Sequence, residues 1–182
     1  MAELTNGEVT QEEVDELFNA LANETPPTSF NPNEGVIVND EAVFGTPPNV
    51  DGDGKTDILL VSIRDGHDGP NGIGGFVFSG DLNTCGNNRD ILYLESQLSR
   101  LSDFGLVAAH EYQHLIHFNY NEEHGIREET FVNEGLAEWA ELMNGYSGRD
   151  ITYLNSPFSY NVSFLSGFQG LDSQTTENAY QR

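Results

Sequence analysis

Two histidines separated by three residues, in the segment 110–114 (His-Glu-Tyr-Gln-His), most constrain what this chain can fold into. Apolar residues around the segment recur at helical spacing, so we expect a helix over 102–118, capped by Ser102 or Asp103. Residues four apart share one face of a helix, so His110 and His114 can bind a single zinc ion. Glu111 would stand beside that ion as a general base. The segment therefore predicts the site of a zinc hydrolase.

The third ligand is expected from a second helix over 131–143. Glu134, Glu138 and Glu141 fall at i, i+4 and i+7 of that helix and can share one face. We favour Glu134, because the small residue Gly135 beside it would let the two helices approach closely. Glu138 and Glu141 would then support the ligands or face solvent. Two histidines and one glutamate leave a fourth coordination position open, as catalysis requires.

Two other histidines are candidates for metal binding. His117 lies one helical turn after His114, but the Gly and His that would follow it at fixed offsets in a metzincin are missing. We interpret it as a residue that supports the ligands or packs in the core. His67 lies in a polar, glycine-rich loop over 65–72 and is interpreted as a surface residue.

The segments 110–119 and 132–138 together resemble those of the gluzincin metallopeptidases, and are most similar to the hyicolysin-type family of secreted neutral zinc peptidases. The likeness covers 104–143 closely and 43–95 more loosely. It implies that zinc is bound by His110, His114 and Glu134, with Glu111 as the general base. It also implies a downstream Tyr or His that stabilises an oxyanion, for which Tyr180 is the first candidate, followed by Tyr146, Tyr153 and Tyr160.

The fold class expected is α+β, a zincin-like domain with a small twisted mixed sheet over the active-site helix and the second ligand-bearing helix. Residues 10–22 predict an amphipathic helix that opens with a capping box. Short strands are expected at 36–38, 58–63, 75–79 and 90–94, with 58–63 buried on both faces. A polar connection is expected over 119–129, after which Thr130 could cap the second helix.

Two domains are expected, an N-terminal helix and linker over 1–30 and a zincin-like catalytic domain over 31–182. The last residues, 176–182, predict a helix that begins without reaching a cap. We therefore expect the catalytic domain to be truncated at its C-terminus and to come from a larger parent protein.

A second candidate metal site is the segment 49–57, which alternates oxygen-bearing side chains with glycine before a strand. Calcium binds six to eight hard oxygens, and Gly54 at the sixth position permits the sharp bend that brings them together. Leu60 replaces the glutamate that an EF-hand would have at the twelfth position. The alternative is a solvated Asp/Gly turn. The expected calcium ligands are Asn49, Asp51, Asp53, Asp57 and the carbonyl of Lys55.

The net charge of the chain limits the classes of partner that it can bind. Seven Lys and Arg against 30 Asp and Glu give a formal net charge of −23, which argues against nucleic acid or an anionic membrane as the main partner. No apolar run is long enough for a membrane span, and the single cysteine, Cys85, excludes an intrachain disulfide. Such acidity fits a secreted or cell-surface protein whose signal sequence was removed, or a salty environment.

The function expected is therefore that of a zinc-dependent endopeptidase that acts on proteins or peptides through a zinc-activated water. One alternative is a calcium-stabilised binding or adhesion module of a larger surface protein, in which the zinc site is structural or catalytically silent. Another is a zinc hydrolase that acts on a non-peptide amide. A complete downstream Tyr or His would distinguish the endopeptidase from the binding or adhesion module.

Overall fold

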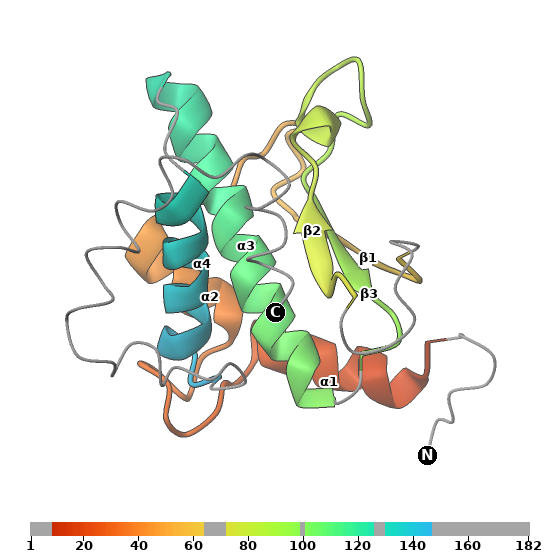
Figure 1. The fold of residues 1–182 in the computed structure, drawn as a ribbon, viewed down its shortest axis with the longest axis vertical. Coiled ribbons are helices and arrows are strands. Elements are labelled where there is room, and N and C mark those ends of the chain that lie inside the picture. Colours follow the sequence, from red (N-terminus) through yellow and green to blue (C-terminus); the bar gives the residue numbers. More distant parts are fainter. Residues whose placement is uncertain (1–8, 64–71, 99–100, 126–129, 147–182) are drawn as a thin grey trace.

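The computed structural model describes residues 9–63, 72–98, 101–125 and 130–146 of the 182-residue chain. This part is mixed α+β, with four α-helices and a small three-stranded sheet (Figure 1). The longest helix, α3, runs between the sheet on one side and α2 and α4 on the other. The elements are α1 (Gln11–Ala22), α2 (Val36–Phe44), β1 (Asp57–Val61), β2 (Gly75–Val77), the short 3-10 helix η1 (Ser79–Leu82), β3 (Ile91–Glu95), α3 (Leu101–His124) and α4 (Thr130–Met143).

The sheet has the order β1-β3-β2, with β1 parallel and β2 antiparallel to the central β3. It is therefore mixed, as expected. One face packs on α3, and on the other face Leu59, Tyr93 and Phe76 form a row across the three strands. The rings of Phe76 and Tyr93 stack with their centroids 4.5 Å apart. Leu59 is 48% exposed, so the prediction that the first long strand is buried on both faces is wrong.

The core forms where α3 meets the sheet and α1. Phe104 and Ala108 of α3 pack in one cluster with Leu94 of β3, and Leu17 and Leu21 of α1 belong to the same cluster. Side chains of α1 are thus buried against the helix that carries the two histidines. No helix in the described ranges combines the length and the apolar character needed to cross a bilayer.

The helix predicted over 10–22 is confirmed as α1. Thr10 is its N-cap, and the Thr10 hydroxyl oxygen accepts a hydrogen bond from the Glu13 backbone N–H. The Glu13 carboxylate in turn accepts one from the Thr10 backbone N–H. This reciprocal pair satisfies two N–H groups that the first helical turn leaves without a partner.

The strand predicted over 36–38 is wrong, because these residues open helix α2 with Gly35 as its N-cap. A short apolar run fits a buried helical turn as well as it fits a strand, so contacts distant in sequence decide. Here α2 packs on both α3 and α1. Gly35 lies so close to α1 that a Cβ atom would be 2.2 Å from the Leu21 carbonyl oxygen.

The helix α3 is longer than expected at both ends. It includes Leu101, ahead of the expected caps Ser102 and Asp103, and it continues to His124, where a polar connection over 119–129 was predicted. A helix at the surface can continue through polar residues, whereas it ends where the backbone adopts a positive φ. Gly125, with φ of 61°, follows the last helical residue. The second helix begins at Thr130, the residue predicted to cap it.

The strands predicted at 75–79 and 90–94 correspond to β2 and β3. β2 is shorter than expected, because the chain turns into η1 at Ser79. β3 is shifted by one residue, to Ile91–Glu95.

Candidate metal centre

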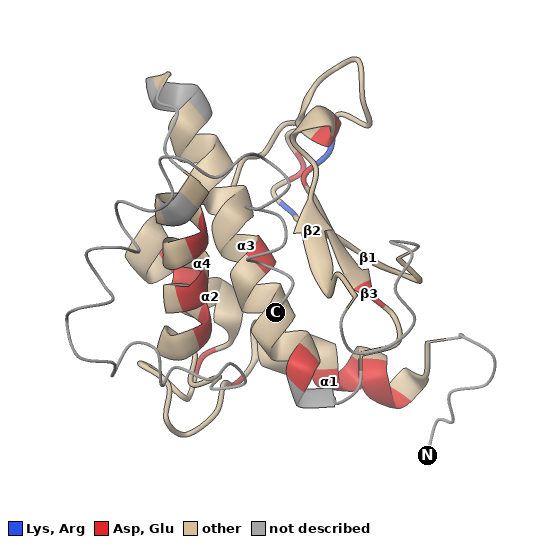
Figure 2. Cartoon of the chain, viewed as in Figure 1, with Lys and Arg blue, Asp and Glu red and all other residues tan. Residues whose placement is uncertain are grey.

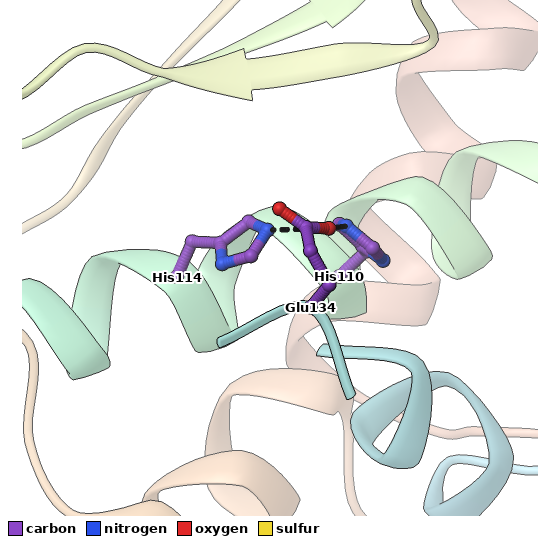
Figure 3. A group of neighbouring side chains, drawn as sticks. All are labelled: His110, His114 and Glu134. Atoms are coloured by element: carbon purple, nitrogen blue, oxygen red, sulfur yellow. Dashed lines mark ion pairs between the residues drawn. The ribbon is translucent and has the colours of Figure 1, made fainter. Parts of the chain in front are cut away.

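The two histidines of α3 and one glutamate of α4 point toward a common position between the helices (Figure 3). Glu134 Oε2 lies 3.3 Å from His110 Nε2 and 3.6 Å from His114 Nε2. One ligand atom from each of the three residues lies within 4.8 Å of the others. The helical spacing of the two histidines places both on one face of α3. The packing of α4 along α3 brings Glu134 to the same position.

These separations fit a tetrahedral zinc ion. With bonds of about 2.0–2.1 Å, neighbouring ligand atoms of such an ion lie roughly 3.3–3.4 Å apart. The two separations to the Glu134 oxygen, 3.3 and 3.6 Å, are close to that value. Two imidazoles and one carboxylate are a ligand set that zinc accepts while keeping one position for water or substrate. The residues present therefore fit zinc.

The outer nitrogen of each imidazole also has a partner. His110 Nδ1 lies 2.7 Å from Glu141 Oε1, and His114 Nδ1 lies 3.1 Å from Asn133 Oδ1. Both partners accept hydrogen bonds, so each Nδ1 donates its N–H and each Nε2 faces the centre. Three residues of α4, namely Asn133, Glu134 and Glu141, thus fix the two histidines of α3.

Glu134 is the glutamate that joins the histidines, and Glu138 is outside this group. Glu141 supports His110, one of the roles left open for it. Asn133 was not expected to take part. Its position just before Glu134 places it on the neighbouring side of the helix, where its amide oxygen reaches the second histidine.

The pKa values of the group follow from this packing. Burial favours the neutral form of His110, but hydrogen bonds to Glu134 and Glu141 outweigh burial and raise its pKa to about 10. Burial also disfavours the charged form of Glu134, yet its hydrogen bonds to His110 and His114 lower its pKa to about 2. At neutral pH His110 therefore carries a proton on both ring nitrogens, and a metal ion that binds Nε2 would have to displace the proton there.

Glu111, the predicted base, is buried between α3 and the sheet, with 8% of its surface exposed. A Cβ atom added to Gly75 of β2 would lie 2.9 Å from Glu111 Cγ, so the side chain passes directly over this strand. β2 is at the edge of the three-stranded sheet. Glu111 thus lies next to the candidate ligand His110 in sequence and against an edge strand in space.

The reason given for Gly135 was wrong. This glycine is exposed, and a Cβ atom added to it would meet no atom within 4 Å. Ala137 and Ala140 of α4 are fully buried, so other small residues of this helix, and not Gly135, lie in the interior.

The remaining candidates lie apart from this centre or outside the described residues. His117 is buried on α3 but is not one of the converging ligands. Tyr146 packs in the core cluster with Phe104, where its hydroxyl fills the space over Gly105. Outside the described residues lie His67, Tyr153, Tyr160 and Tyr180.

The segment 49–57 forms a tight loop whose side chains bind its own backbone. Asn49 Oδ1 accepts a hydrogen bond from the Gly54 N–H at 2.9 Å, and Asp51 Oδ1 accepts one from the Asp53 N–H at 3.1 Å. Asp53 Oδ1 accepts one from the Lys55 N–H at 2.8 Å. The bonds of Asp51 and Asp53 each reach the N–H two residues further on and are those of Asx turns, as the turn interpretation predicts.

Two aspartates beside this loop have partners of their own. Asp57, expected to bind calcium, forms an ion pair with Arg89. Asp90 is buried and accepts a hydrogen bond from the Val50 N–H at 3.1 Å, and burial is the main cause that raises its pKa. Among the described His, Cys, Asp and Glu residues, only the His110 group has three ligand atoms that converge. Calcium binding at 49–57 stays a prediction.

Comparison with protein-family models, with curated proteins and with solved structures found no match to this chain. The candidate function therefore depends on the chemistry of the residues themselves.

Proposed function

We propose that this protein is a zinc-dependent endopeptidase. The observation that carries the proposal is the convergence of His110, His114 and Glu134, with both outer imidazole nitrogens held by acceptors. Histidines oriented in this way by hydrogen bonds at the outer nitrogen are typical of metal ligands in proteins. The proposal accords with the resemblance of segments 110–119 and 132–138 to gluzincin peptidases.

Each residue has a defined task in this reaction. His110 and His114 would bind through Nε2 as neutral imidazoles, with Glu134 as the third ligand. The ion they hold would act as a Lewis acid and lower the pKa of water toward about 7. Glu111 would accept the proton of the attacking water and pass it to the departing amine. Its side chain is buried, so bulk solvent has little access to the carboxylate.

The proposed substrate is an extended peptide that lies along β2. An edge strand offers backbone N–H and C=O groups, and pairing with them demands no particular side chain. The contact of Glu111 with Gly75 would bring the base close to a carbonyl of such a peptide. The net charge of −23 supports a protein or peptide partner over nucleic acid and accords with a secreted or cell-surface location.

The alternative is a binding or adhesion module with a structural or catalytically silent zinc site. What favours it is the place of Tyr146, which packs in the core cluster instead of beside the histidines. The other tyrosines considered for oxyanion stabilisation lie outside the described residues.

The deciding experiment measures bound metal and casein hydrolysis on the same preparations, before and after chelation. Wild type should contain one zinc per chain and hydrolyse casein, and chelation should abolish hydrolysis. Glu111→Gln should keep the zinc and lose hydrolysis, whereas Glu16→Gln, an exposed change on α1, should behave as wild type. Zinc without hydrolysis in wild type would favour the silent module, and no zinc would reject both functions.

A further inference from the structure

A buried polar cluster joins α2 to the end of α4, apart from the metal centre. Asp40 Oδ1 accepts a hydrogen bond from Asn144 Nδ2 at 2.6 Å, and Asn39 Nδ2 donates to Asn144 Oδ1 at 3.1 Å. Asn144 is the residue directly after α4. Asn39, Asp40 and Asn144 are all fully buried. Together they are the polar connection between the two helices at this end of the molecule.

The second carboxyl oxygen of Asp40 has no partner. Within the described residues, Asp40 Oδ2 and Asn39 Oδ1 are both buried without a hydrogen bond. In the part of the chain that the structure describes, no cationic side chain forms an ion pair with Asp40, and the ionisable groups near it are Glu41 on α2, Tyr112 on α3 and Tyr146 after α4. An ionised carboxylate here would have one amide donor and no countercharge, an arrangement that costs several kcal/mol.

We propose that Asp40 is a neutral carboxylic acid in the folded protein and that its ionisation loosens the junction between α2 and the end of α4. The neutral form fits the environment, since an O–H on Oδ2 is a donor and the other orphaned atom of this cluster, Asn39 Oδ1, is an acceptor. Helix α4 also carries Glu134 and Glu141 of the candidate metal centre. A change at the end of α4 therefore occurs on the helix that positions these two residues. This inference does not depend on the proposed function.

The electrostatics agree with this geometry. Burial raises the pKa of Asp40 to about 8, against an opposing contribution from the Asn144 hydrogen bond. Both neighbouring tyrosines also have raised pKa values, chiefly because they are buried, so they stay neutral while Asp40 titrates. The unfolded chain loses this proton near pH 4 and the folded protein near pH 8. Stability is therefore lost as pH rises between these values and levels off above about 8.

The first test is urea denaturation of the full chain from pH 5 to pH 9. Asp40→Asn keeps the shape of the side chain and removes the proton, and Asp15→Asn on the exposed face of α1 is the matched control. Relative to Asp40→Asn, wild type should lose stability up to about pH 8 with a slope of about one proton, and the Asp15→Asn protein should follow wild type. A constant difference between wild type and Asp40→Asn across this range would overturn the proposal.

A second measurement needs no variant. Infrared spectra of wild type labelled with ¹³C-aspartate should show a protonated aspartate at pH 6.5 that titrates near pH 8. Its absence at pH 6.5 would overturn the proposal even if Asp40→Asn failed to fold.

The loosening itself is measured by amide hydrogen exchange. The reporters are the N–H groups of Asn144 and Tyr146, which donate to Ala140 and Glu141 at 3.0 and 2.9 Å. Their protection, corrected for intrinsic exchange, should fall as pH rises through about 8 in wild type and stay constant in Asp40→Asn, while α1 is unchanged in both. Equal protection in the two proteins at every pH would reject the effect on the junction.

Discussion

Gly75 of β2 lies so close to Glu111 of α3 that a single added carbon would collide with the glutamate side chain. The Cβ atom would be 2.9 Å from Glu111 Cγ, 2.8 Å from Val107 Cγ1 and 2.9 Å from the Tyr93 carbonyl oxygen. Two of these contacts are to side chains of α3 and one is to the sheet backbone, so neither side can yield without moving the helix from the strand. The glycine therefore sets the distance between the proposed base and the edge strand.

Gly75→Ala is expected to displace Glu111 without removing a metal ligand. Casein hydrolysis should fall by about 10- to 100-fold, because a misplacement of about 1 Å at a catalytic group has that effect. Bound zinc should stay at the wild-type level. Gly135→Ala is the matched control, since a Cβ atom there meets nothing within 4 Å. Full activity in Gly75→Ala would show that the glutamate does not depend on this contact.

Glu134→Ala and Glu138→Ala separate the two glutamates one helical turn apart. Glu134→Ala should lose most of the zinc affinity because it removes a ligand, whereas Glu138→Ala should bind zinc as wild type does. The measurement is zinc affinity by competition with a chelating dye. Equal loss in both variants would mean that the ligand assignment is wrong.

Glu141→Gln tests the partner of the first histidine. Its carboxylate accepts from His110 Nδ1 at 2.7 Å, and changes at such supporting positions typically lower metal affinity by about 10- to 100-fold. The glutamine keeps the shape and an acceptor oxygen but removes the charge. We expect weaker zinc binding with the fold retained, measured by the same competition. A wild-type affinity would reduce this hydrogen bond to a packing contact.

Zinc binding at neutral pH should release about one proton from His110. Its pKa is raised to about 10, so the metal-free protein carries the proton that the metal replaces. Titration calorimetry in buffers of different ionisation enthalpy counts the protons released. The count should fall toward zero at pH values above about 10. No dependence on the buffer at pH 7.5 would contradict the charged state described for this histidine.

His110 and Glu134 also contribute to the pH dependence of the stability of the metal-free protein. The raised pKa of His110 gives stability that is complete below pH 6.5 and is lost as pH rises through about 10. The lowered pKa of Glu134 gives stability that is complete above pH 4.5 and is lost as pH falls through about 2. In urea denaturation, Glu134→Gln should therefore destabilise most between about pH 4.5 and 6.5.

Calcium binding at 49–57 predicts a stability change that appears only with the ion. Replacing Asp51 and Asp53 by Asn should lower the melting temperature in calcium and leave it unchanged in a chelator. Equal melting behaviour of variant and wild type in both conditions would leave the segment as a turn, as its internal hydrogen bonds suggest.

The features that the sequence could predict are those that depend on residues close together along the chain. The capping box of α1 joins residues three apart, and the spacing of His110 and His114 is a property of one helix, so both were readable. The helical conformation of residues 36–38 could not be predicted, because their apolar side chains suit either a strand or a helix. The packing of α2 on α3 decides between the two. The role of Asn133 was equally hidden, since it depends on how far α4 is rotated about its own axis.

The residues of the candidate metal centre come from two helices, α3 and α4, which the chain joins through residues 125–129. An ion shared by His110 and Glu134 would tie together points 24 residues apart in the sequence, as a covalent cross-link does. Such a tie restricts the unfolded chain and disfavours separation of α4 from α3. Zinc would thereby act as a removable cross-link between α3 and α4.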